Sequence, residues 1–169
     1  ENVKKFASIK GYVTGLQKGR DELVLDIGVF EPRIAYARVP LAHLQTHLAK
    51  GKKASLLQIS ESWGFGGNLP LEIKVLEVNL EEKFVISELH ANQIHKFARW
   101  KDSLLDRLIV IGASLAEVTS VIENEGLKRD VIDVEKLGMF EHALVCKLGT
   151  DAAGLIGPVG RRLRKAKFT

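Results

Sequence analysis

The amino-acid sequence predicts an α+β protein of two modules, a small β-barrel followed by a sheet in the order βαββαβ. Three observations support this prediction. Short runs of alternating apolar and polar residues, separated by turn residues, fill much of the chain from residue 6 to residue 87. A run with helical spacing interrupts them after the third predicted strand. After residue 103, strand patterns alternate with helix patterns.

Composition limits the class of protein. The chain has 169 residues, of which 46% are hydrophobic and 27% charged, so it can bury a core and is not broadly disordered. No apolar run reaches the length of a membrane span. The single Cys146 excludes an internal disulfide framework. We therefore expect a reducing, cytoplasmic location.

The first half reads as a barrel. The predicted strands are residues 6–13, 23–28, 33–39, 53–60, 71–75 and 83–87. Leu41, Leu44 and Leu48 recur at helical spacing after the third strand, and Gly51 is expected to stop that helix. Five or six strands with a short helix after the third is the order of a Greek-key OB barrel.

The second half reads as a ferredoxin-like α+β module. A polar helix over residues 90–103 connects it to the barrel, which gives domains at residues 1–89 and 104–169. The predicted strands are residues 108–111, 131–134, 143–148 and 165–169. Ser114 and Glu117 form a capping-box pattern for the first helix, which Gly126 closes. Asp151 is expected to cap the second.

The first half also resembles the S1-type OB domain of RNA-binding proteins. The matching stretches are Gly11-Tyr12-Val13, Val24-Leu25-Asp26-Ile27-Gly28, Val39-Pro40-Leu41-Ala42-His43-Leu44, Lys74-Val75-Leu76-Glu77-Val78-Asn79 and Phe84-Val85-Ile86-Ser87. The resemblance implies that single-stranded RNA binds on a curved face, with aromatic rings stacking on bases and cations contacting the backbone. The second strand departs from the S1 pattern because it carries aliphatic residues where aromatics are usual.

Two groups of candidate RNA-binding residues follow. The first lies on the barrel face and its loops and comprises Lys10, Tyr12, Lys18, Arg20, Arg33, Tyr36 and Arg38. Tyr12 and Tyr36 either stack on bases or pack at the barrel rim. The second group is Trp63 and Phe65, which stand among glycines. This loop is either a mobile aromatic finger that stacks on a base or inserts into a partner, or a β-bulge or hairpin tip whose Trp folds back on the core.

The C-terminal segment Ile156-Gly157-Pro158-Val159-Gly160 resembles the Ile-Gly-x-x-Gly loop of KH domains. The resemblance implies that Gly157 and Gly160 let the backbone approach nucleic-acid phosphates. A KH unit needs a further helix and strand, for which too few residues remain. The alternative is one amphipathic helix in which the glycines allow close packing and Pro158 causes a kink. Its buried residues would be Leu155, Ile156, Val159 and Leu163.

The last nine residues carry five cations and no acid. Such a basic tail attracts polyanions and makes binding depend on salt, unless it is only a solvated, frayed terminus. The candidate contacts are Arg161, Arg162, Arg164 and Lys165.

Residues 130–138 and 145–151, with Gly154-Leu155, are similar to the C-terminal part of a family of uncharacterised archaeal proteins. The similarity extends more loosely over the barrel. It implies archaeal origin and two modules, and it implies no catalytic residue.

Enzyme patterns are weak. His43 and His47 have metal-ligand spacing on one helix face but no third ligand, so we expect neither a metal site nor a cofactor. Cys146 and His142 lie too far apart along a strand for a dyad, which places Cys146 in the core.

The predicted function is therefore non-enzymatic binding of RNA in archaeal translation or RNA processing. The expected partner is single-stranded RNA, with ribosomal RNA and a protein complex as further candidates and no membrane partner. The alternative is a protein-interaction or small-ligand regulatory module. Its basis is that Asp151-x-x-Gly154-Leu155 resembles the ligand-binding loops of ACT-type domains.

Overall fold

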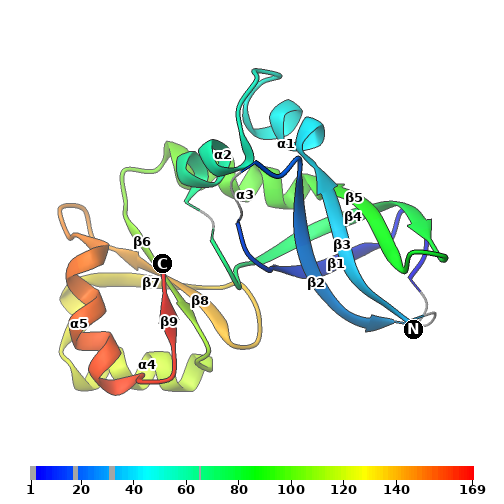
Figure 1. Cartoon of the computed structure of the whole chain (residues 1–169). Helices are drawn as coiled ribbons and strands as arrows, with labels where there is room; N and C mark the ends of the chain where they lie inside the picture. The colour runs from blue at the N-terminus through cyan, green and yellow to red at the C-terminus, as the bar shows by residue number, and fades with distance from the viewer. Residues whose placement is uncertain (1–2, 17–18, 31–32, 65) are drawn as a thin grey trace. The chain divides into compact units, whose positions relative to one another are not determined.

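The computed structural model describes residues 3–16, 19–30, 33–64 and 66–169. The chain divides into two compact units, Glu1–Arg99 and Trp100–Thr169. The first contains a closed five-stranded barrel and the second a four-stranded sheet with helices, so the protein is of mixed α+β class (Figure 1). Among the described helices, none combines the length and apolar character that a membrane span requires.

The barrel of the first unit closes in the strand order β1-β2-β3-β5-β4. Its strands are β1 Ser8–Val13, β2 Glu22–Phe30, β3 Ile34–Pro40, β4 Pro70–Asn79 and β5 Phe84–Leu89. Antiparallel pairing of β1 with β4 closes the barrel, and β3 pairs with β5 in parallel. The last pairing joins strands that are distant in the sequence, and it decides which outward side chains become neighbours.

Alternate residues of these strands fill the barrel interior. Leu23 and Leu25 of β2 are fully buried, as are Ala37 and Val39 of β3. Gly11 of β1 also faces inward, where a Cβ atom would come within 2.9 Å of the Leu25 Cβ. Since a side chain at residue 11 would overlap this core, the glycine allows β1 to lie close to β2.

Two short helices, α1 Leu41–Leu48 and α2 Leu56–Trp63, separate β3 from β4. The first confirms the helix predicted from the leucine spacing. The predicted strand over residues 53–60 is wrong, because most of that stretch is helical. The Ser55 side chain accepts a hydrogen bond from the Gln58 N–H, and the Gln58 side chain accepts one from the Ser55 N–H. This capping box starts a helix that buries Leu56 and Ile59 on one face.

Helix α3, Ala91–Asp102, follows the barrel. The Gln93 Oε1 accepts a hydrogen bond from the Glu72 backbone N–H, at 3.0 Å between the heavy atoms, and Phe97 is buried. These contacts attach the helix to the barrel. The first unit accordingly extends to Arg99, within the helix that the sequence predicted as a connector between separate domains.

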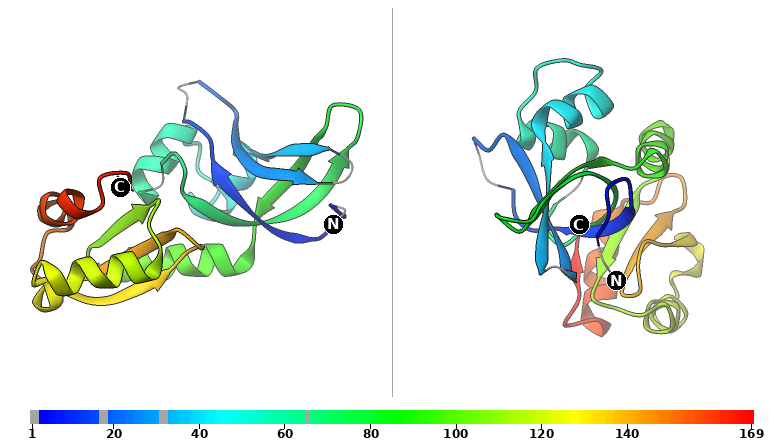
Figure 2. Two further views of the ribbon diagram at one scale, coloured as in Figure 1. Left: turned by 90° about the horizontal axis from the view of Figure 1, so that it is seen from below. Right: turned by 90° about the vertical axis from the view of Figure 1, so that its right-hand side faces the viewer.

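The second unit has an antiparallel sheet in the order β7-β8-β6-β9. Its elements are β6 Arg107–Ile111, α4 Leu115–Asn124, the 3-10 turn η1 Leu127–Arg129, β7 Val131–Lys136, β8 Glu141–Cys146, α5 Ala152–Arg162 and β9 Lys167–Phe168. Helices α4 and α5 cover one face of the sheet (Figure 2). Their apolar residues form one core with Leu108, Val110, Leu144 and Cys146.

The predicted caps of this unit are present. The Ser114 Oγ and the Glu117 carboxylate form the capping box of α4. The Asp151 side chain accepts a hydrogen bond from the Ala153 N–H at the start of α5. At the C-terminus, Thr169 exchanges two backbone hydrogen bonds with Ile109. The end of the chain is therefore attached to the sheet, and the expectation of a frayed terminus is wrong.

Candidate nucleic-acid interface

A row of side chains crosses the outer face of the barrel. In the sheet register Tyr12 lies opposite Asp26, Asp26 opposite Tyr36, and Tyr36 opposite Phe84. Neighbouring positions along these strands, among them Leu25, face the interior, so the members of the row point outward. Tyr36 is 49% exposed and Tyr12 half-buried. The fold thus brings two of the predicted tyrosines to one face with a third ring beside them.

The third ring, Phe84, was not among the candidates predicted from the sequence. The Arg38 guanidinium carbon lies 3.9 Å from the centroid of the Phe84 ring, and Phe84 is only 8% exposed. The Arg38 Nε is 3.7 Å from a Glu22 carboxylate oxygen. Arg38 is therefore held as a flat cationic surface above an aromatic ring. The sequence signal that could have identified Phe84 is an aromatic residue at an outward position near the start of the predicted strand 83–87.

The remaining predicted cations of the barrel are spread over strand and loop positions. Lys10 is exposed on β1, in register with Glu72 of β4. Arg20 is exposed in the connection before β2, and Arg33 is exposed just before β3. Lys18 lies outside the described residues. The structure thus places Lys10 on the same outward side of β1 as Tyr12, and the other two at the strand ends.

Another ring that the sequence analysis missed, Phe6, is exposed. It is 62% exposed, and the ammonium groups of Lys5 and Lys74 lie 5.1 Å and 5.3 Å from its centroid. An exposed ring flanked by cations suits stacking on a base beside a phosphate. Phe6 began the first predicted strand, whereas in the structure it precedes β1 and has a positive φ of 66°.

Trp63 does not form a mobile finger. It is the last residue of α2, its indole Nε1 donates a hydrogen bond to the Leu48 carbonyl over 3.0 Å, and its ring centroid lies 5.9 Å from that of Phe97. The interpretation in which this Trp folds back on the protein is the correct one, although it ends a helix and not a hairpin. Phe65 lies outside the described residues.

We expect Trp63→Phe to lower the free energy of unfolding by about 1 kcal/mol, because it removes the hydrogen bond to Leu48 and keeps an aromatic ring. RNA affinity should stay unchanged. Urea unfolding and fluorescence anisotropy measure the two quantities. Weaker RNA binding at unchanged stability would restore the finger interpretation.

The KH-like interpretation of residues 156–160 is wrong. These residues all lie inside α5, whereas a phosphate-binding loop must expose its backbone N–H groups. The expectation of close packing at the glycines is wrong as well. A Cβ atom at Gly157 would meet no atom within 4 Å, and one at Gly160 only the Phe168 ring at an ordinary 3.6 Å. The alternative of a single helix is confirmed, and of its predicted buried face Leu155 and Val159 are buried and Leu163 is partly buried. Ile156 is 40% exposed.

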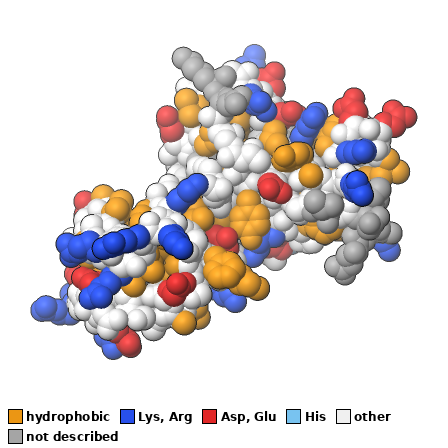
Figure 3. Space-filling view, turned by 60° about the horizontal axis from the view of Figure 1, so that its bottom comes forward, with side chains coloured by type: hydrophobic (Ala, Val, Ile, Leu, Met, Phe, Trp, Pro, Cys, Tyr) orange, Lys and Arg blue, Asp and Glu red, His pale blue; other side chains and the backbone are white. Residues whose placement is uncertain are grey.

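The predicted basic tail begins with Arg161 and Arg162, which end α5 and form ion pairs with one acid. The Arg162 Nε lies 2.6 Å from a Glu125 carboxylate oxygen, and the Arg161 Nη2 lies 3.7 Å from the other. The hydrogen bond from Arg162 lowers the pKa of Glu125, and the charge of Arg161 acts in the same direction. Arg164 and Lys165 are exposed. Lys and Arg side chains gather over the second unit in the space-filling view (Figure 3).

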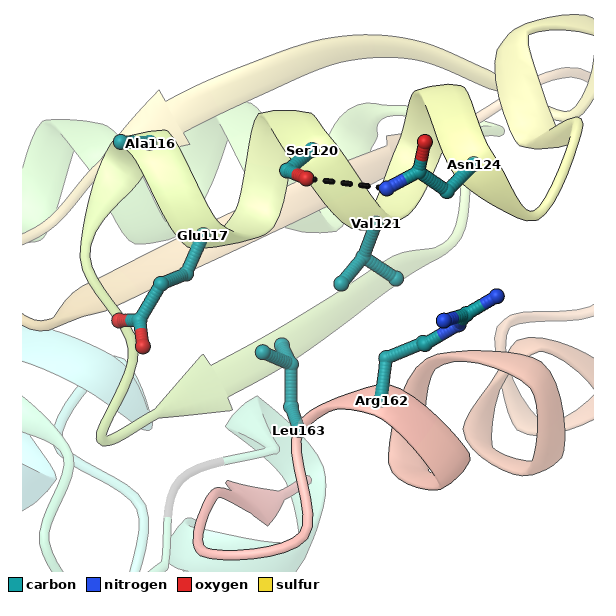
Figure 4. A pocket seen from close by; sticks show the side chains of 7 residues that line it. All are labelled: Ala116, Glu117, Ser120, Val121, Asn124, Arg162 and Leu163. Carbon is teal, nitrogen blue, oxygen red and sulfur yellow. Dashed lines mark hydrogen bonds between the residues drawn. The ribbon is translucent and has the colours of Figure 1, made fainter.

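A pocket of about 440 Å³ lies between α4 and α5 (Figure 4). Its lining residues are Ala116, Glu117, Ser120, Val121, Asn124, Arg162 and Leu163. Most of the polar groups there already have partners. The Asn124 Nδ2 donates to the Ser120 Oγ, Arg162 binds Glu125, and hydrogen bonds from Ser114 lower the pKa of Glu117. The Asp151 turn that resembles an ACT loop is at the other end of α5.

The Cys146 thiol and the His43–His47 pair, which were considered as catalytic or metal-binding groups, have contacts that explain them as structural residues. Cys146 belongs to the second core, where burial raises the pKa of its thiol and nearby carboxylates add to the effect. His43 Nδ1 and His47 Nε2 each lie 3.9 Å from a Glu88 carboxylate oxygen. In the described part of the chain, no three or more His, Cys, Asp or Glu side chains are arranged to hold a metal ion.

Comparison with known proteins gives the family. No curated protein matches the sequence. A chain in the crystal structure of the a/eIF2alpha-aDim2p-rRNA complex from Pyrococcus horikoshii OT3 is similar, with 11% identity, a TM-score of 0.38, and 78% of this chain and 71% of that chain covered. The DUF2110 central domain matches residues 3–101, and the DUF2110 C-terminal domain matches residues 105–169. The chain therefore belongs to the DUF2110 family.

Proposed function

We propose that this protein is a non-enzymatic RNA-binding protein that holds single-stranded RNA on the outer face of its barrel. One observation carries the proposal. Tyr12, Tyr36 and the Arg38–Phe84 stack lie on the outward side of strands β1, β3 and β5. These strands are close together because β2 pairs with both β1 and β3, and β3 pairs directly with β5. Stacked rings and a guanidinium plane are the groups that bind unstacked bases without requiring a duplex.

We assign the barrel to the OB class in its S1-like form, and the second unit to the ferredoxin-like class. The closed order β1-β2-β3-β5-β4, with helices between the third and fourth strands, supports the first assignment. The βαββαβ succession with a four-stranded antiparallel sheet supports the second. An S1-like barrel favours a place in archaeal translation or RNA processing, with ribosomal RNA among the candidate ligands.

The second unit contributes charge in this proposal. Arg164 and Lys165 are exposed, whereas Arg161 and Arg162 are partly neutralised by Glu125. Exposed cations contact phosphates without regard to sequence, and each contact releases counterions. We therefore assign Arg164 and Lys165 to sequence-independent contacts with RNA phosphates. We assign the barrel face to base stacking. Trp63 has no role in the proposed interface.

The experiment is fluorescence anisotropy of the full chain with a labelled, unstructured RNA at 50 mM and 200 mM salt. We expect binding that weakens steeply with salt, by a logarithmic slope of about −0.7 per phosphate contacted. A duplex of the same length is the control and should bind more weakly, because its bases are not available for stacking. Failure to bind the single strand at the lower salt concentration would end the proposal.

The pocket between α4 and α5 favours a second candidate function, a small-ligand regulatory module. A drug-sized ligand needs roughly 300–1,000 Å³, and the pocket lies within that range. Its paired polar groups leave few free donors or acceptors for a ligand. A small molecule that raises the melting temperature of the wild type but not of a Ser120→Leu variant would support this candidate.

A further inference from the structure

The outer face of the barrel contains an acidic group in the middle of its aromatic row. Asp26 of β2 is exposed and lies in register between Tyr12 of β1 and Tyr36 of β3. Adjacent strands are separated by about 4.8 Å, so the two tyrosine backbones lie about 10 Å apart with the carboxylate between them. In the described part of the chain, Asp26 takes part in no ion pair.

The local backbone holds this carboxylate in place. The Asp26 Oδ1 accepts a hydrogen bond from the Gly28 N–H, with 2.8 Å between the heavy atoms. Gly28 has a positive φ of 78°, and the strand register shifts between Asp26 and Phe30. A carboxylate has about four acceptor positions, so one bond to Gly28 leaves both oxygens able to accept others.

A carboxylate at this place repels phosphate. A strand that crosses the row must therefore turn its backbone away from Asp26 and its bases toward it. Of the RNA bases, guanine presents two adjacent donors, N1–H and the 2-amino group, which match the two oxygens of a carboxylate. Adenine and cytosine offer one amino donor each, and uracil places a carbonyl on each side of its single N–H.

We propose that Asp26 reads a base stacked beside Tyr36 and makes the barrel face prefer guanine over uracil. This inference rests on the proposed RNA-binding function and adds a specificity-determining residue to it. The alternative is that Asp26 only shapes the strand through its bond to the Gly28 N–H. Asp26→Asn separates the two roles, because its side-chain oxygen can still accept from Gly28 while its amide group donates a hydrogen bond.

The test is fluorescence anisotropy of the full chain with two labelled RNA heptamers, one all uridine and one with a single central guanosine. For the wild type we expect the guanosine heptamer to bind on the order of tenfold more tightly. Asp26→Asn should abolish this preference, and the uridine heptamer should bind at least as tightly as to the wild type, because a charge that repels phosphate is removed. Asp26→Ser, whose hydroxyl can also accept from Gly28, should do the same.

The outcomes separate this inference from the proposal on which it rests. If neither heptamer binds at low salt, the RNA-binding function itself fails. If both bind with equal affinity to the wild type, or if Asp26→Asn and Asp26→Ser keep the guanosine preference, RNA binding stands and base reading by Asp26 is wrong. Melting temperatures of both variants show whether the barrel is intact.

Discussion

Tyr36→Ala is expected to weaken RNA binding by about 5- to 150-fold, because stacking of one base on an aromatic ring is worth roughly 1–3 kcal/mol. Tyr36 is the most exposed ring of the row and lies beside the Arg38–Phe84 stack. Adding Tyr12→Ala should weaken binding further, since the second ring lies on the same face across β2. Fluorescence anisotropy with an unstructured RNA measures both effects.

Two controls accompany this prediction. Tyr36→Phe keeps the ring and should retain nearly all of the affinity. Because Tyr36 is half exposed, its removal should change the free energy of unfolding little, which urea denaturation can verify. Equal affinities of the wild type and Tyr36→Ala would show that the barrel face is not where RNA stacks.

The second large effect is expected in the core of the second unit, at His142. This residue of β8 is fully buried, and neither ring nitrogen has a hydrogen-bond partner among the described residues. Burial lowers the pKa of His142. The charge of Lys136, its cross-strand neighbour, acts in the same direction, whereas the Ala113 backbone and the Glu141 carboxylate oppose the shift.

The sign of the pH dependence follows from this lowered pKa. Below about pH 6.5 the unfolded chain binds a proton at His142 before the folded chain does. The contribution of neutral His142 to stability is therefore complete above that pH and is lost as the pH falls toward the folded pKa. We expect the free energy of unfolding, measured by urea denaturation, to be lower at pH 5.0 than at pH 7.5.

His142→Leu provides the comparison. It replaces a buried polar ring that lacks partners by an apolar side chain of similar size, so it should stabilise the protein by about 1–3 kcal/mol at pH 7.5. The stability difference between pH 7.5 and pH 5.0 should also become smaller than in the wild type. A destabilised variant with an unchanged pH dependence would mean that His142 is satisfied in the folded core.

The local features of the fold could largely be predicted from the sequence. Alternating residues predicted the five strands that form the barrel, and Ser114 with Glu117 predicted the start of α4. Helix α2 was predicted as a strand although Ser55 and Gln58 form the same kind of capping box. The reason is that a short apolar run does not by itself distinguish a strand from a helix.

The candidate site could be predicted only in part. Tyr12, Tyr36 and Arg38 were chosen as aromatic and cationic residues of the predicted barrel face, and the structure places them on one face. Phe84 was missed because its neighbour Tyr36 is 48 residues away and reaches it through the parallel pairing of β3 with β5. Trp63 was considered as a contact to RNA because no nearby residue in the sequence indicates that its indole N–H donates to the Leu48 carbonyl.

The sequence by itself determined the type of most elements through their hydrophobic periodicity, and also their order and their helix caps. These features depend on residues within a few positions of one another. Only the tertiary structure decided which outward side chains became neighbours, that Asp26 lies between two tyrosines, and that the residues resembling a KH loop are helical. Strand register and core packing join residues that are far apart in the chain, so no local pattern of residue types specifies them.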